Sequence, residues 1–220
     1  MENIVWLNTT EYTVSELGLF FTGAICWVLC YVFIVKDIYK YKYVGIPAGV
    51  VGANFAWEFL WAFVFHHDMG FLIQIGYYGW FILDCVIVFN MFRYGYKQVR
   101  PAIQKDFNSY FAFSIAAWFL VLYFFIQNGY DNPIGANSAY SIQLLISTTF
   151  VMLLLNIDKV RGKLNPFSNW MRMLGSLFCG IMCCIHWPEN TWILSMIIVY
   201  MIIDIYFLVN MYKKLAKEKM

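Results

Sequence analysis

The chain alternates between long apolar runs and short polar connections. Seven runs are each long enough to supply the ~20 apolar residues with which a helix crosses ~30 Å of hydrocarbon. The connections are short, so we expect a single domain over residues 1–220 and no separate soluble module. The pattern predicts an all-α polytopic membrane protein, a bundle of seven transmembrane helices. The expected spans are approximately 17–35, 44–65, 71–92, 108–127, 138–157, 167–186 and 190–212.

Composition agrees with a lipid environment. Hydrophobic residues make up 62% of the chain, aromatic residues 21% and charged residues only 13%. Soluble domains are nearer half apolar and a quarter charged. A soluble fold of this size would have to expose much of that apolar surface, so we expect an integral membrane protein. Its location would be the plasma membrane in a bacterium or the endoplasmic reticulum in a eukaryote.

Lysine and arginine occur only on alternate connections, and the remaining connections carry acids instead. Cytoplasmic loops of membrane proteins are enriched in these two residues, so we expect the N-terminus outside and the C-terminus in the cytoplasm. A basic cytoplasmic face suits anionic lipid headgroups and does not indicate nucleic acid. The basic residues of this face are Lys36, Lys40, Lys42, Arg93, Lys97, Arg100, Lys105, Lys159, Arg161, Lys163, Arg172, Lys213, Lys214, Lys217 and Lys219.

Three acids lie near the middle of their apolar runs: Glu58, Asp84 and Asp204. An ionisable group in hydrocarbon costs at least ~2.5–3.5 kcal/mol on the insertion scale, so a functional site is the default interpretation. The alternative is a protonated or hydrogen-bonded acid that only ties helices together. At their similar depths the three acids can converge on one cavity. We expect no Lys, Arg or His there to pair with them, so they should be neutral acids that can donate a proton.

Polar and aromatic residues share helix faces with these acids. Asn54, Trp80 and Tyr200 each precede one acid by four residues, which is about one helical turn. Asn54 could orient its acid, and Tyr200 could donate a hydrogen bond to the acid that follows it. Gln143 and Ser147 repeat the spacing in the fifth run, and interhelical hydrogen bonding is their alternative role.

Several aromatic residues lie too deep to belong to the interfacial belts, among them Trp57, Trp61, Tyr77 and Trp80. Such residues usually pack a core. Aromatic faces beside buried acids also suit carbocation chemistry. A ring attracts a cation by up to ~2 kcal/mol or more when desolvated, and it offers no nucleophile to trap it.

Other classes of membrane protein fit less well. A retinal-type photoreceptor needs a Schiff-base lysine in the last helix, and residues 192–211 contain none. No clustered aspartates of the DDxxD type occur, so we expect no metal; His66, His67 and His186 with Asp68 are more simply loop residues. Internal repeats typical of transporters are not visible. A proton-coupled small-molecule transporter or a lipid-binding membrane protein stays open as an alternative.

Three features together resemble a known family: residues 54–58 (Asn-Phe-Ala-Trp-Glu), Trp80 one turn before Asp84, and Asp204 in the last run. They resemble the small seven-helix membrane-integrated terpene cyclases, which are the fungal meroterpenoid and indole-diterpene cyclases and their bacterial relatives. The resemblance implies that Glu58 and Asp204 are the catalytic residues, which protonate a terminal epoxide or alkene of a prenylated aromatic substrate.

We therefore expect a metal-independent, proton-initiated cyclisation inside the membrane. The reaction is an isomerisation, so no cofactor is required. A prenyltransferase or an epoxidase would act in the same pathway. The residues expected to bind substrate around the acids are Asn54, Trp57, Trp61, Tyr77, Trp80, Asp84, Gln143, Ser147 and Tyr200.

Overall fold

A computed structural model describes residues 4–219, which form seven α-helices and no strand. The all-α, seven-helix architecture expected from the sequence is thereby confirmed. A π-helical turn, η1 (Leu60–Val64), continues α2, and two short 3-10 helices, Gly95–Gln98 and Pro101–Asp106, precede α4. The helices are α1 (Val14–Tyr41), α2 (Ala48–Phe59), α3 (Phe71–Tyr94), α4 (Phe107–Gln127), α5 (Ala136–Asn156), α6 (Pro166–His186) and α7 (Thr191–Lys217).

Five of the helices are long and apolar enough to cross a membrane: α1, α3, α4, α5 and α7. The α2–η1 segment is a shorter apolar run, Ala48–Val64. Helix α6 has a polar face, and that face is buried: Ser168, Asn169, Arg172 and Ser176 are all at most 5% exposed. The bundle therefore encloses polar groups in its interior, where they must find partners within the protein.

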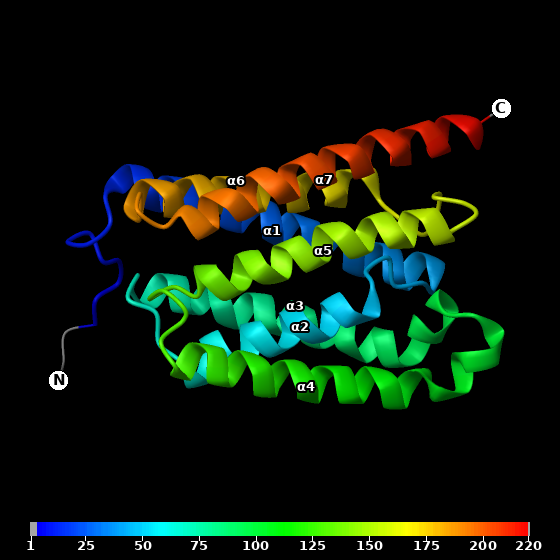
Figure 1. Cartoon of the computed structure of the whole chain (residues 1–220), viewed down its shortest axis with the longest axis horizontal. Helices are drawn as coiled ribbons and strands as arrows, with labels where there is room; N and C mark the ends of the chain where they lie inside the picture. The colour runs from blue at the N-terminus through cyan, green and yellow to red at the C-terminus, as the bar shows by residue number, and fades with distance from the viewer. Residues whose placement is uncertain (1–3, 220) are drawn as a thin grey trace.

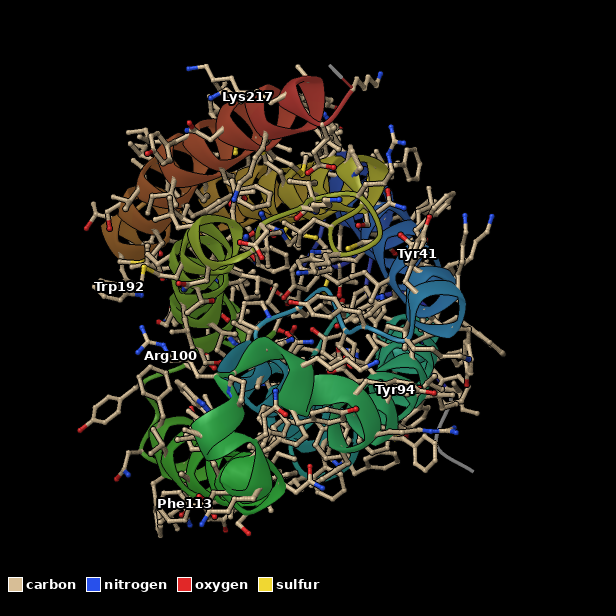
Figure 2. All side chains as sticks on the ribbon, turned by 90° about the vertical axis from the view of Figure 1, so that its right-hand side faces the viewer. Tyr41, Tyr94, Arg100, Phe113, Trp192 and Lys217 are labelled. Carbon is tan, nitrogen blue, oxygen red and sulfur yellow. The ribbon has the colours of Figure 1, made fainter. Side chains whose placement is uncertain are left out.

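The helices run up and down along the long axis of the molecule (Figure 1). The N-terminus lies at one end with the loops 65–70, 128–135 and 187–190. The C-terminus lies at the other end with the connections 42–47, 95–106 and 157–165 (Figure 1). In the end-on view, Phe113 of α4 and Lys217 of α7 lie on opposite sides of the bundle (Figure 2).

Helices α1 and α6 make the most extensive helix–helix contact. Glycine allows their backbones to approach closely, because a Cβ added at Gly23 would lie 2.5 Å from the Cys179 sulfur and 2.7 Å from the Gly175 carbonyl oxygen. Small residues at a helix crossing are the usual means of close packing in membranes.

Helix α2 is central to the other half of the bundle, where it packs against α3, α4 and α5. Its contact residues include Ala53 and Ala56, both 0% exposed. Glu58 follows Ala56 by two residues and is also buried, at 3% exposed. The π-helical turn begins two residues after Glu58, and such turns frequently occur at functional sites.

Candidate active site

Glu58 belongs to a hydrogen-bonded cluster contributed by three helices. The Tyr31 hydroxyl of α1 donates to Glu58 Oε1 over 2.5 Å, and the Asn54 amide of α2 donates to the same oxygen over 2.9 Å. Asn54 also donates to Oδ2 of Asp84 on α3, over 3.0 Å. The Asn54 amide therefore bridges the two carboxyl groups. Asn54 thus orients Glu58, as its spacing of one turn predicts.

Both acids of the cluster are buried. Glu58 is 3% exposed and Asp84 is 2% exposed, and neither makes an ion pair within residues 4–219. Two neighbouring carboxylates in such a site cannot both be ionised, so at least one carries a proton. Oε1 of Glu58 already accepts two hydrogen bonds, whereas Oε2 has no partner among the described residues. Oε2 is therefore the Glu58 oxygen that can carry the proton.

Glu58 also lines a cavity with an aromatic wall, which we call the aromatic cavity. Its volume is about 110 Å³. The ring of Tyr77 lies 5.6 Å from that of Trp57 and 5.4 Å from that of Trp80. The lining residues are Phe20, Trp27, Tyr31, Asn54, Trp57, Glu58, Tyr77, Trp80, Ile134, Ala136, Ala139, Tyr140, Ile142, Gln143, Ile146, Ser176, Cys179 and Cys183.

The aromatic wall is fixed by contacts near the start of α5. Trp57 Nε1 donates to the Ser138 hydroxyl over 2.9 Å, and the Tyr77 hydroxyl donates to the Ile134 carbonyl over 3.1 Å. The ring of His67 stacks on Tyr77 at 4.9 Å. Burial lowers the pKa of His67 to about 4, so its imidazole is neutral at ordinary pH. These contacts hold the aromatic wall in place. His67 adds no positive charge to it.

A second, smaller cavity of about 30 Å³ lies next to the aromatic cavity. We call it the rear cavity. Asp84 and Arg172 line it, and Tyr31 and Asn54 line both cavities. Glu58 and Asp84 therefore face different spaces although they belong to one hydrogen-bonded cluster.

Asp204 has different surroundings. Arg172 donates from Nη1 to Oδ2 over 3.0 Å and from Nη2 to Oδ1 over 2.8 Å. The guanidinium group also lies over the Phe150 ring at 4.7 Å. The expectation that no basic residue pairs with the buried acids is therefore wrong for Asp204. Arg172 was assigned to the connection before α6, but this helix begins at Pro166 and carries Arg172 nearly two turns into the bundle.

The expected meeting of Glu58 and Asp204 in one cavity is also wrong. Asp204 is 0% exposed and lines neither of the two cavities. A bidentate contact with an arginine stabilises the ionised carboxylate, which is not a proton donor. Its geometry is that of a buried ion pair between α6 and α7.

The other residues expected at the site divide into three groups. Five of them line the aromatic cavity: Asn54, Trp57, Tyr77, Trp80 and Gln143. Asp84 lines the rear cavity. The remaining residues, Trp61, Ser147 and Tyr200, are buried but line neither cavity.

Each of these remaining residues has a packing role. The ring of Trp61 lies 6.4 Å from that of Trp57, and Ser147 accepts a 3.4 Å hydrogen bond from Gln143. Tyr200 stacks on Tyr140, and its hydroxyl has no hydrogen-bond partner within residues 4–219. The expected hydrogen bond from Tyr200 to the acid one turn later is therefore wrong.

Among the residues of the site that escaped the sequence argument are Tyr31, Trp27 and Arg172. The first two lie on α1, whose buried acid, Glu16, is in the first turn of the helix, about three turns before Trp27. Arg172 had a usable signal, because an arginine within the run 167–186 is itself an intramembrane charge.

The histidines at the N-terminal end of the bundle have structural partners. His186 lies 3.1 Å from Glu16 and stacks on Tyr12, and His67 accepts a hydrogen bond from the Met69 backbone. Within the part of the chain that the structure describes, no three His, Cys, Asp or Glu residues are grouped as metal ligands would be.

Comparison with known proteins identifies the family of this chain. The Pyr4-like transmembrane terpene cyclase family matches residues 8–214. The Pyr4-family terpene cyclase mfmH of Annulohypoxylon moriforme is 26% identical over 175 residues, which is 77% of this chain and 70% of the relative. Asnovolin H synthase nvfL of Aspergillus novofumigatus is 25% identical over 209 residues, 90% of this chain and 84% of the relative. Terpene cyclase macJ of Penicillium terrestre is 25% identical over 179 residues, 77% and 66% respectively.

No solved structure matches this chain. The family match nevertheless covers nearly the whole sequence, including every helix that contributes to the two cavities. The protein is therefore an integral membrane enzyme that belongs to the Pyr4-like transmembrane terpene cyclases.

Proposed function

We propose that this cyclase protonates the terminal alkene or epoxide of a prenylated aromatic, meroterpenoid-type substrate, with Glu58 as the proton donor and without a metal. The observation that supports it is the position of Glu58. Its carboxyl group belongs to a cluster that must hold a proton, and its side chain lines the aromatic cavity.

The reaction adds one proton to the substrate and later removes one, so the product has the same composition as the substrate. The Glu58 proton passes to the epoxide oxygen or to an alkene carbon, and the opening C–O bond or the consumed double bond leaves a carbocation. Internal double bonds of the chain attack this cation in turn and close the rings. Loss of a proton from the last cation gives a cyclic isomer of the same mass, so no redox cofactor takes part.

The aromatic wall suits the cationic stage of this reaction. Trp57, Tyr77 and Trp80 present ring faces that stabilise a passing positive charge without bonding to it. The apolar remainder of the wall excludes water, which would otherwise capture the cation. The same wall accommodates a hydrocarbon chain that enters from the bilayer.

Glu58 is preferred to Asp204 as the donor, although the family resemblance implicates both. Asp204 is held as a carboxylate by Arg172 and does not line the aromatic cavity. We propose that this ion pair fixes α6 against α7 and that Asp204 affects catalysis only through that packing.

Membership of a cyclase family favours the enzyme over the carrier or lipid-binding protein that the sequence left open. We propose a substrate supplied by a prenyltransferase, with or without an epoxidase. In a eukaryotic cell the enzyme would reside in the endoplasmic reticulum, and in a bacterium it would reside in the plasma membrane.

The test is Glu58→Gln in detergent-solubilised enzyme, supplied with a prenylated aromatic compound with and without its terminal epoxide. General acid catalysis commonly supplies ~10²–10⁴-fold, so this variant should form almost no cyclic isomer by mass spectrometry and NMR. The matched control is Glu189→Gln, which makes the same change at an exposed residue. Product formation that persists in Glu58→Gln, or that is abolished by a chelator in the native enzyme, would contradict the proposal.

A further inference from the structure

The two acids of the cluster face opposite spaces. Glu58 lines the aromatic cavity, where the substrate is proposed to bind, and Asp84 lines the rear cavity. Between them, the Asn54 amide donates to both carboxyl groups, and the Tyr31 hydroxyl donates to Glu58. The pair therefore spans the partition between the two cavities.

The rear cavity has polar groups on one side and an apolar wall on the other. Asp84, Asn54, Tyr31 and Arg172 supply the polar groups. Arg172 is 2% exposed, and its Nε has no hydrogen-bond partner among residues 4–219. An enclosed water needs two to four polar partners, and these four side chains are the polar residues that line the cavity.

The apolar wall of the rear cavity leads toward one end of the bundle. Ile34, Val50 and Val51 form part of it, and Ile46 lies in the connection between α1 and α2. That connection is at the same end as the C-terminus (Figure 1). The rear cavity thus extends from Asp84 toward the end of the bundle that holds the C-terminus, where Ile46, Val50 and Val51 are buried.

Repeated turnover requires a route by which the Glu58 carboxylate regains a proton from a space other than the aromatic cavity. A donor that has protonated the substrate is a carboxylate, and hydrocarbon fills the aromatic cavity beside it. Water that entered from the substrate side would capture the carbocation. The lost proton must therefore be replaced from a direction that does not pass through the aromatic cavity.

We propose that Asp84 returns the proton to Glu58 from water in the rear cavity, an inference that rests on the proposed function of Glu58. After Glu58 gives its proton to the substrate, the Asp84 carboxyl group passes a proton to the Glu58 carboxylate. A water or hydronium in the rear cavity then protonates Asp84. The final cation gives its proton to a solvent water rather than to the Glu58 carboxylate, so each turnover takes one proton from solvent and returns one to it.

The test follows hydrogen isotopes. Enzyme prepared in ordinary water is diluted into heavy water for a variable delay, and substrate is then added for a single turnover. The deuterium at the initially protonated position, measured by mass spectrometry, reports how fast Glu58 exchanges its proton with solvent. In Asp84→Asn we expect this exchange to be at least ~10-fold slower than in the native enzyme. Later turnovers should slow by more than the first turnover does, because only they require the Glu58 proton to be replaced.

Two further variants make the test specific. Asp158→Asn is the matched control, because it makes the same change at an exposed residue and should exchange as the native enzyme does. Val51→Phe keeps both acids but fills part of the rear cavity, so it should also slow the exchange. This second variant decides the question if Asp84→Asn does not fold.

Three results would overturn the inference. Deuterium could reach the product equally fast in Asp84→Asn or Val51→Phe and in the native enzyme. Asp84→Asn could slow the first and later turnovers equally without changing the isotope content, which would make Asp84 a purely structural neighbour. The native enzyme could form unlabelled product over many turnovers in heavy water, which would mean that Glu58 takes back the same proton. Failure of the proposed function gives a different result: cyclisation would continue in Glu58→Gln.

Discussion

Two buried carboxyl groups, those of Glu58 and Asp204, have opposite electrostatic surroundings. Glu58 shares its donors with a second acid and has no basic partner, so its cluster retains a proton. Asp204 has both oxygens occupied by Arg172 and retains a charge. Residue type and burial are similar at the two sites. The neighbouring side chains therefore decide which acid can donate a proton.

The Arg172–Asp204 pair gives a prediction at the residue scale. Asp204→Asn leaves the Arg172 guanidinium buried without a counter-charge, which should destabilise the protein by about 3–5 kcal/mol. Thermal unfolding in detergent would show this as a lowered Tm. The double variant Arg172→Met with Asp204→Leu removes both charges and should recover most of the lost stability.

The double variant also separates packing from chemistry. If Asp204 acts only through its ion pair, the folded double variant should still form cyclic product at a rate within about tenfold of the native enzyme. A double variant that folds stably and makes no product would show that Asp204 takes part in the reaction itself.

At the residue scale, the sequence predicted contacts between side chains one helical turn apart. Asn54 and Glu58 are one turn apart, so their hydrogen bond could be expected from the helical period alone. Tyr31 is contributed by another helix, and nothing in the sequence of α1 indicates which of its residues faces Glu58. Contacts within a helix follow from periodicity, whereas contacts between helices depend on how the bundle packs.

At the scale of elements, the expected spans and the observed helices agree in number and order but not at their ends. Helix α1 begins at Val14 rather than at residue 17, because Thr13 and Glu16 form a reciprocal capping box. Helix α7 continues to Lys217, beyond its apolar run. The π-helical turn η1 was not predicted, because an apolar run has no period that distinguishes it from α-helix.

The connection between α4 and α5 gives a prediction at this scale. Gly135 has φ +76°, and an added Cβ would clash with the Trp61 ring. Gly135→Ala combines a left-handed backbone, which costs ~1–2 kcal/mol, with a steric clash that costs a further ~1–3 kcal/mol. Because Trp61 packs beside Trp57 in the aromatic wall, we also expect cyclisation to fall by about tenfold or more.

Gly129→Ala is the matched control for that change. Gly129 has nearly the same backbone, φ +75°, but an added Cβ would meet no atom within 4 Å. It should therefore lose only the stability due to the backbone and keep its activity. Equal effects of the two substitutions on Tm and product formation would argue against the contact with Trp61.

At the scale of the whole molecule, the bundle encloses two adjacent spaces with different linings. Aromatic rings dominate one, whereas the other brings Asp84 and Arg172 together against an apolar wall. The sequence predicted one central cavity for all three acids, because depth in the membrane can be counted along a helix. Counting residues does not give the direction in which each side chain points around the bundle axis. The Asp204 side chain points in a direction that leaves it outside both cavities.

The orientation of the bundle in the membrane gives the last prediction. The connections 42–47, 95–106 and 157–165 lie at the same end of the bundle as the C-terminus (Figure 1). Most Lys and Arg residues that precede α7 lie in these connections or close to them in the sequence. The opposite end includes Asp68, Asp131 and Glu189, and its loops 65–70, 128–135 and 187–190 contain no Lys or Arg. Retention of lysine and arginine on the cytoplasmic side should therefore place the C-terminus in the cytoplasm. A reporter fused after Met220 should be active only there, and one inserted at Asp131 should be active only on the other side. If both report the same side, the chain does not cross the membrane as an up-and-down bundle. If both are reversed, charge does not set its orientation.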